Sequence, residues 1–194
     1  MNIINAIKTG DVQRAPRLEA MLSKAIESNK QRELTYVRQA TIDALTGCKN
    51  RRAFDNDIAA LMNDHQPFSL ALVDIDNFKT INDTWGHLNG DIVLRNVARE
   101  GLQILQPLQI SLYRYGGEEF AVIFTTGHSD DALKLLESWR ARVAQRSWRE
   151  EGLTVTFSAG LGEWNMEPLE QLVVRVDEAL YKAKQQGKNR IVRA

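Results

Sequence analysis

Two pairs of carboxylates stand where the sequence predicts strand ends, an arrangement that can hold a divalent cation. Glu118 and Glu119 follow a Gly-Gly pair between two apolar runs, 110–115 and 120–124, which predicts a two-residue hairpin turn with positive φ angles at the glycines. Side chains alternate along a strand, so the two glutamates are expected to diverge and to take different roles. Taken alone, this pattern is more typical of an ordinary hairpin with a solvated acidic tip.

Asp74 and Asp76 form the second pair, at the end of the apolar run 68–75. If this strand lies beside the hairpin, Asp74 faces the glycine turn and its carboxylate converges with that of Glu118. Hard oxygen ligands suit Mg²⁺, which keeps several waters and shares its coordination with substrate phosphates. Asp74 and Glu118 are therefore the expected ligands, and the Ile75 carbonyl is a further candidate. Asp76 is either another ligand or, as we favour, the residue that holds the following turn.

The order of the predicted elements indicates an α+β fold of the ferredoxin-like βαββαβ type, in which an antiparallel-centred, palm-type sheet is flanked by helices on one face. This topology places the first strand beside the central hairpin. In the helix expected at 90–105, the inward residues are Ile92, Val93, Val97 and Leu102. The expected strands span 68–75, 110–115, 120–124, 153–161 and 189–193, and the other helices span 51–63, 77–84, 130–149 and 168–186.

An N-terminal helical segment, 1–39, is expected to precede a main domain at 40–194. After Pro16 the stretch 17–40 contains neither glycine nor proline and has a broken apolar stripe at helical spacing. The stripe is too sparse for a core of its own. It either pairs with a second copy as a short coiled coil, which we favour, or docks on the domain.

Composition narrows the class of protein without giving a function. The chain has 194 residues, with 25 basic and 25 acidic side chains, so its net charge does not suggest a nucleic-acid or membrane-surface partner. The single Cys48 excludes an intramolecular disulfide and fits a reducing compartment. No apolar run approaches a membrane span, and the polar N-terminus does not resemble a signal peptide. These features predict a cytoplasmic protein.

Several short motifs, taken together and in order, closely resemble the GGDEF domains of diguanylate cyclases, with Glu at the central position of Gly-Gly-Glu-Glu-Phe. Each motif is weak by itself, but their joint occurrence from about Asp43 to Val192 is highly specific. The motifs are Asp-Ala-Leu-Thr-Gly at 43–47, Asn-Arg at 50–51, Asp-Ile-Asp-Asn-Phe-Lys at 74–79, Asn-Asp at 82–83, Gly-His at 86–87, Gly-Asp at 90–91, Ala-Leu-Tyr-Lys-Ala-Lys at 179–184 and Gly-Lys-Asn-Arg at 187–190.

The resemblance implies a nucleotide-cyclase fold and a nucleotidyltransferase that condenses two GTP into cyclic di-GMP, a bacterial second messenger, with release of two pyrophosphates. It also implies a homodimer in which each domain holds one GTP. Asp74, the Ile75 carbonyl and Glu118 are the implied ligands of Mg²⁺, for which Mn²⁺ is an alternative. Asp74, Glu118 and Glu119 are the implied catalytic residues, and Glu119 is assigned to the 3′-hydroxyl.

The substrate-binding residues follow from the same resemblance. Asn82 and Asp91 match a guanine-reading pair, although alone they are typical of a helix surface and a helix N-cap. The backbone at Phe78 and Lys79 is expected to hold phosphates at a helix N-terminus. Lys184 and Lys188, one helical turn apart, match a basic pair that holds the phosphate tail, although alone they are typical of a solvated helix end. Gly116 and Gly117 complete the predicted substrate-binding set.

Two departures from the family pattern affect these expectations. Lys188 stands where many members have Arg, so it keeps the charge but lacks a bidentate fork, and we expect weaker triphosphate binding with activity retained. Many members carry an inhibitory Arg-x-x-Asp product site before the hairpin. The matching stretch, 107–110, is Pro-Leu-Gln-Ile, so no inhibitory product site is expected.

Two other function classes remain open from sequence. The domain could be a catalytically silent module that binds GTP or cyclic di-GMP, which the intact carboxylates disfavour. It could also be a scaffold that uses only its N-terminal helix for assembly. An assay of GTP turnover distinguishes all three.

Overall fold

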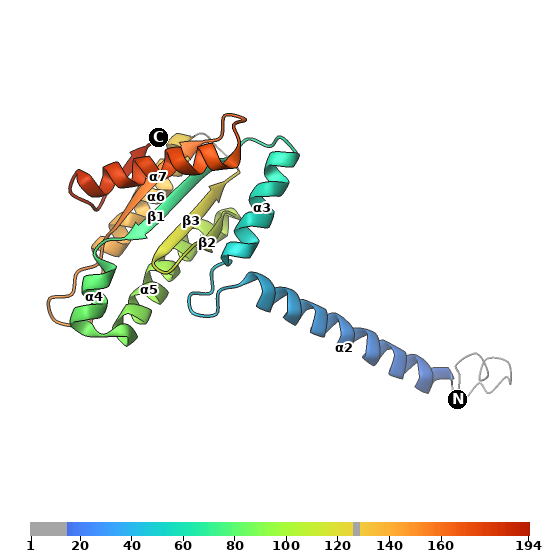
Figure 1. Cartoon of the computed structure of the whole chain (residues 1–194). Helices are drawn as coiled ribbons and strands as arrows, with labels where there is room; N and C mark the ends of the chain where they lie inside the picture. The colour runs from blue at the N-terminus through green and yellow to red at the C-terminus, as the bar shows by residue number, and fades with distance from the viewer. Residues whose placement is uncertain (1–14, 126–128) are drawn as a thin grey trace. The chain divides into compact units, whose positions relative to one another are not determined.

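The computed structural model describes residues 15–125 and 129–194, in two compact units that divide between Ala40 and Thr41 (Figure 1). Residues 1–14 of the expected N-terminal segment lie outside the described residues. None of the described helices is both long enough and apolar enough to cross a membrane.

The first unit is dominated by helix α2, Ala15–Thr41. It begins close to the expected start, because Pro16 fits the first helical turn, where its missing N–H would have no partner anyway. Met21, Leu22 and Ile26 are 62%, 53% and 59% exposed. They lie at helical spacing on one face, so part of the predicted apolar stripe is open to solvent along this helix.

The second unit is built on a five-stranded sheet of order β2-β3-β1-β4-β5. The central strand β1 pairs antiparallel with β3 on one side and with β4 on the other, while β5 runs parallel to β4. This confirms the antiparallel-centred, ferredoxin-like fold and the position of the first strand beside the hairpin. The strands are β1 Ser69–Ile75, β2 Ser111–Arg114, β3 Glu119–Phe124, β4 Phe157–Glu163 and β5 Ile191–Arg193.

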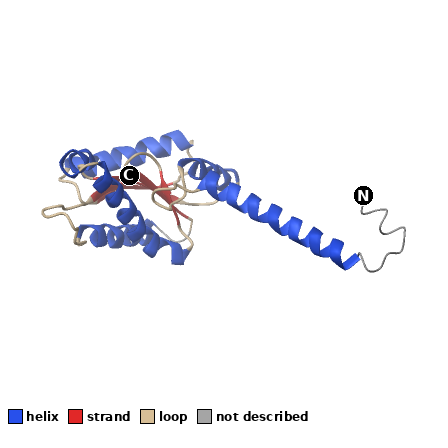
Figure 2. Cartoon of the chain, turned by 90° about the horizontal axis from the view of Figure 1, so that it is seen from below, coloured by secondary structure: helices blue, strands red, loops and turns tan. Residues whose placement is uncertain are grey.

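Helices cover both faces of this sheet, so the expectation of helices on one face was wrong (Figure 2). Alternate residues of β1 explain why: Ala71, Val73 and Ile75 join one buried cluster, and Leu70 and Leu72 join another. Helices α4, α5 and α6 contribute to the first cluster, and α3 and α7 to the second. The helices are α3 Arg51–Asn63, α4 Phe78–Trp85, α5 His87–Leu105, α6 Ser129–Ala144 and α7 Leu169–Gln185, with a 3₁₀ turn η1 at Gln106–Leu108.

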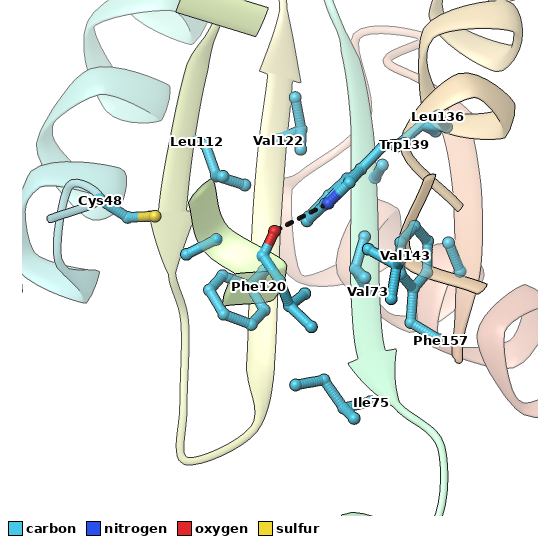
Figure 3. Close-up of a cluster of buried hydrophobic side chains, with 14 of the residues drawn as sticks. Cys48, Val73, Ile75, Leu112, Phe120, Val122, Leu136, Trp139, Val143 and Phe157 are labelled. Carbon is cyan, nitrogen blue, oxygen red and sulfur yellow. Dashed lines mark hydrogen bonds between the residues drawn. The ribbon is translucent and has the colours of Figure 1, made fainter. Parts of the chain in front are cut away.

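The first cluster is centred on Trp139, whose side chain is fully buried between the sheet and α5 (Figure 3). Its indole N–H donates to the Val97 carbonyl at 3.0 Å, so the polar atom of this large side chain is satisfied. The ring packs against Phe157 and Phe120, with centroid distances of 4.7 and 6.2 Å. This packing fixes α6 on the sheet.

Several boundaries and faces differ from the sequence-based expectation. Val93 and Val97 of α5 are buried as expected, but Ile92 is 39% exposed and Leu102 is only half-buried. Helix α6 ends at Ala144 rather than near residue 149. Strand β4 begins at Phe157 rather than at residue 153, since the buried residues just before it have no ladder partners in the sheet.

Candidate active site

Three carboxylates meet where β1 ends and β3 begins. Asp74 is opposite Glu119 in the antiparallel register, and the Ile75 amide donates to the Glu118 carbonyl at 3.4 Å. Burial raises the pKa of Asp74. Lys184 lowers this pKa, and the negative charges of Glu118 and Asp76 raise it further. Burial, then the charges of Asp74 and Glu118, raise the pKa of Glu119. A cation bound among these groups would relieve their mutual repulsion.

Lys184, in the last turn of α7, supplies positive charge to this cluster. Its ammonium lies 3.0 Å from Oδ2 of Asp74, and it also opposes the rise in the pKa of Glu119. The lysine was expected to hold phosphate, whereas here it forms an ion pair with an expected metal ligand. Any cation bound by Asp74 would compete with this ion pair.

The donor set fits Mg²⁺ better than a metal that requires a complete protein cage. Within residues 15–125 and 129–194, no group of three or more His, Cys, Asp or Glu side chains is arranged to hold a metal ion. Asp74 and Glu118 offer two carboxylates, and the Ile75 carbonyl can add a third oxygen. Mg²⁺ takes few protein ligands and completes its octahedron with waters and phosphate oxygens, so it tolerates such an open site.

The hairpin turn differs from the predicted type. Neither Gly116 nor Gly117 has a positive φ angle, unlike four other glycines in the described residues, which are Gly47, Gly86, Gly152 and Gly187. The turn is longer than two residues, because the amides of Tyr115 and Gly116 both donate to the Glu119 carbonyl, at 2.8 and 3.2 Å. Gly116 has another effect: an added Cβ would lie 2.4 Å from Oε2 of Glu119, so the side chain of Glu119 would have to move. The absent side chain makes room for that carboxylate.

Arg114 fixes the turn from outside, a role that no sequence motif predicted. Its guanidinium donates to the Gly117 carbonyl at 2.8 Å and pairs with Asp43 at 3.2 Å. Asp43 in turn accepts from the amide and hydroxyl of Thr46 at 2.9 and 2.6 Å. Burial alone would raise the pKa of Asp43, but the Thr46 hydrogen bonds and Arg114 hold it below its usual value. The Asp-Ala-Leu-Thr-Gly motif thus anchors the acidic hairpin.

Asp76 does not join the carboxylate cluster as a ligand. It is 4% exposed and accepts from the hydroxyls of Thr156 and Ser158, both at 2.7 Å, and from the Asn189 amide at 3.0 Å. Its two oxygens therefore accept hydrogen bonds from β4, from the residue just before β4 and from the loop before β5. The expectation that it has a structural role agrees with this geometry, although it holds more than the following turn.

The N-terminus of α4 directly follows β1. Asn77 has left-handed backbone angles, Phe78 is buried in the core, and Lys79 is exposed. The Lys188 ammonium donates to the Asn77 side-chain oxygen, which brings this lysine to the start of α4. Lys188 was expected one helical turn from Lys184, but α7 ends at Gln185 and Lys188 has a positive φ of 62°. The two lysines thus belong to different local structures.

Asn82 and Asp91 lie on α4 and α5, which meet at Gly90. A Cβ at Gly90 would lie 1.9 Å from Oδ1 and 3.0 Å from Cγ of Asn82, so the absent side chain makes room for the amide of Asn82. Asn82 and Asp91 are both half-buried. Asp91 is not an N-cap, because α5 already begins at His87.

The stretch expected to lack a product site forms η1 and the turn that follows it. Gln109 has a φ of 59°, and Leu108 is 52% exposed. Residues 107–110 carry no charged side chain.

Comparisons with known proteins agree with this architecture. The family model described as "Diguanylate cyclase, GGDEF domain" matches residues 40–190. The diguanylate cyclase VdcA of Vibrio cholerae is 40% identical over 162 residues, covering 80% of this chain and 47% of the relative. DgcZ of Escherichia coli is 34% identical over 161 residues, covering 78% of this chain and 53% of the relative. The chain thus spans about half the length of these relatives.

Solved structures give the same result. The crystal structure of the coiled coil and GGDEF domain of DgcB from Caulobacter crescentus, in complex with c-di-GMP, matches with a TM-score of 0.81 and 34% identity, covering 91% of this chain and 99% of that chain. The active GGEEF domain of a diguanylate cyclase from Vibrio cholerae matches with a TM-score of 0.68 and 34% identity, covering 75% and 96%. With the family model covering most of its length, this chain belongs to the diguanylate cyclase GGDEF-domain family.

Proposed function

We propose that this chain is a diguanylate cyclase that condenses two GTP into cyclic di-GMP and releases two pyrophosphates. The observation that carries the proposal is the meeting of Asp74, Glu118 and Glu119 at one end of the sheet, with Lys184 against Asp74 and Lys188 at the start of α4. Carboxylates for a metal and cations for a phosphate tail are the parts that a nucleotidyl transfer needs. The family membership supports the same reaction.

Asp74, Glu118 and the Ile75 carbonyl would hold the metal, Mg²⁺ or Mn²⁺. When bound, the metal neutralises charge that develops on the pyrophosphate leaving group. The Lys184 ammonium lies 3.0 Å from Oδ2 of Asp74. Once a metal occupied that carboxylate, the ammonium would be released to bind a phosphate oxygen. Lys184 would thus balance charge in both states.

Glu119 is proposed to accept the proton of the attacking 3′-hydroxyl. Although the residue is exposed, partial desolvation of its carboxylate, then the charges of Asp74 and Glu118, raise its pKa, so the ionised carboxylate is a stronger base than an isolated glutamate. Gly116 leaves the space that this carboxylate occupies.

The remaining residues would hold the nucleotide. The amides at Phe78 and Lys79 open α4, where the helix dipole and free N–H groups favour phosphate, and Lys188 adds a charge there. Gly116 and Gly117 would let the triphosphate approach the hairpin backbone. Asp91 would accept from guanine N1–H and its amine, and Asn82 would contact O6 or N3. Adenine lacks the N1–H and would leave a carboxylate unpaired.

Two copies are required by this reaction, because one domain binds one GTP and the attacking hydroxyl must come from a facing site. The exposed residues Met21, Leu22 and Ile26 of α2 would pair with the same helix of a second copy and raise the effective concentration of the two domains. The coiled coil of the similar DgcB supports this arrangement. GTP is abundant in the cytoplasm, where we place the activity, and neither nucleic acid nor a membrane is part of it.

Incubation of the chain with GTP and Mg²⁺, followed by chromatography, tests the proposal. Cyclic di-GMP and pyrophosphate are expected in a ratio of one to two. Tight binding of GTP without turnover would indicate a silent binding module, and neither binding nor turnover would leave only a scaffold role.

A further inference from the structure

The loop that carries Lys188 has an unusual backbone. Three consecutive residues have positive φ angles: Gly187 at 112°, Lys188 at 62° and Asn189 at 48°. The loop begins as a Schellman motif, since the Lys188 amide donates to the Ala183 carbonyl at 3.0 Å and the Gly187 amide to the Lys184 carbonyl at 3.4 Å. Left-handed angles are unfavourable for lysine and better tolerated by asparagine, so Lys188 in particular depends on surrounding contacts to hold this loop.

Asn189 is held through both its backbone and its side chain. Its amide donates to Oδ2 of the buried Asp76 at 3.0 Å. Its side-chain oxygen accepts from Nη1 of Arg140 on α6 at 2.8 Å. Arg140 is itself oriented by an ion pair with Glu137 at 2.8 Å, and its side chain is only 22% exposed. A contact across 49 positions of the chain thus fixes the residue next to Lys188.

This geometry determines where the charge of Lys188 lies. Its ammonium donates to the side-chain oxygen of Asn77, at the start of α4. Asn77 is neutral, so an anion can displace it more easily than it can displace the carboxylate that binds Lys184. Among the residues that the structure describes, the partner shown for the Lys188 charge is thus neutral, and it lies beside the backbone N–H groups that open α4.

We propose that Arg140 is a positioning residue, which fixes Asn189 and, through it, holds the Lys188 ammonium where the phosphate tail of GTP binds. Arg140 donates to Asn189 and pairs with Glu137, and it acts only through the loop. The proposal rests on the proposed function, because it takes Lys188 as a phosphate-binding residue. It predicts that a change on α6 alters triphosphate affinity specifically.

Calorimetry on the full chain with Mg²⁺ tests this, using 3′-deoxy-GTP, which lacks the attacking hydroxyl, and GMP, which lacks the phosphate tail. Arg140→Met keeps the apolar stem and removes the donors. We expect its Kd for 3′-deoxy-GTP to rise about three- to tenfold, with no change for GMP. Lys134→Met, which removes an exposed charge from the same helix, is the matched control and should leave both affinities unchanged.

Combination with Lys188→Ala separates positioning from a general charge effect. In the Lys188→Ala background, Arg140→Met should cause no further loss of 3′-deoxy-GTP affinity. An equal loss with and without Lys188 would overturn the proposal, as would unchanged affinity in Arg140→Met alone. Asn189→Gly removes the acceptor yet tolerates positive φ, so it should reproduce the loss even if Arg140→Met is unstable. Full affinity in Lys188→Ala alone would instead refute the phosphate role of Lys188 in the proposed function.

Discussion

Substitution of Asp76 tests how strongly its hydrogen bonds join the end of β1 to β4 and to the loop before β5. Asp76→Ala removes an acceptor shared by Thr156, Ser158 and Asn189, at 2.7, 2.7 and 3.0 Å. A hydrogen bond to a charged group contributes about 1.5–3 kcal/mol, which gives an upper range of about 4.5–9 kcal/mol for this set. Removing a buried carboxylate also recovers its desolvation cost, and the hydroxyls can rotate to other partners. We therefore expect a net loss of about 3 kcal/mol.

Thermal and urea unfolding, followed by circular dichroism, measure this loss. For a domain of about 150 residues, 3 kcal/mol corresponds to a fall in Tm of about 6–12 °C. Asp76→Asn should cost only about 1 kcal/mol, because its carbonyl oxygen can still accept from Thr156 and Asn189 while its amide donates to Ser158. Asp83→Ala, an exposed aspartate on α4, is the control and should change stability by less than about 0.5 kcal/mol. If Asp76→Ala unfolds at the same temperature as Asp83→Ala, the three hydrogen bonds do not hold these elements together.

Three further predictions follow from the proposed reaction. Asp91→Asn should weaken the preference for GTP over ATP in a competition assay, and unchanged selectivity would place guanine recognition elsewhere. Deletion of residues 1–38 should leave a folded domain whose specific activity is low and rises with protein concentration. Equal specific activity of the full-length and truncated chains at high dilution would contradict a role of α2 in pairing. Because residues 107–110 carry no charge, cyclic di-GMP should not inhibit noncompetitively at low micromolar concentration. Inhibition that saturating GTP cannot relieve would reveal a secondary product site.

Much of the fold could be predicted because its signals are local. The bounds of α3 match the expectation, since Asn50 caps it by accepting from the Ala53 amide at 3.0 Å. The position of Asp74 beside the hairpin follows from strand order, although its register partner is Glu119 and not Glu118, with which it was expected to converge. Errors occurred where a local pattern allows two outcomes, as at Ile92, which lies beside the buried stripe of α5.

The contacts that organise the candidate site were harder to predict, because they join distant parts of the chain. Arg114 and Asp43 are 71 positions apart, and Asp76 and Asn189 are 113 apart. The Gly-Gly pair lies between two strands as predicted, but neither glycine has the predicted positive φ, and Gly116 instead leaves space for the Glu119 carboxylate. The four-residue spacing of Lys184 and Lys188 predicts that they share a helix face. Helix α7 ends at Gln185, however, and Gly187 has a positive φ, so Lys188 lies outside the helix.

The carboxylate cluster is the centre of the proposed function, and Glu118→Gln tests it most directly. The substitution keeps the shape of the side chain and removes one ligand charge. Formation of cyclic di-GMP from GTP and Mg²⁺ should fall below detection, while circular dichroism and Tm remain those of the original chain. Glu151→Gln, a change at an exposed residue remote from the site in sequence, should keep full activity. A folded Glu118→Gln variant with near-normal turnover would contradict the assignment of this cluster as the catalytic metal site.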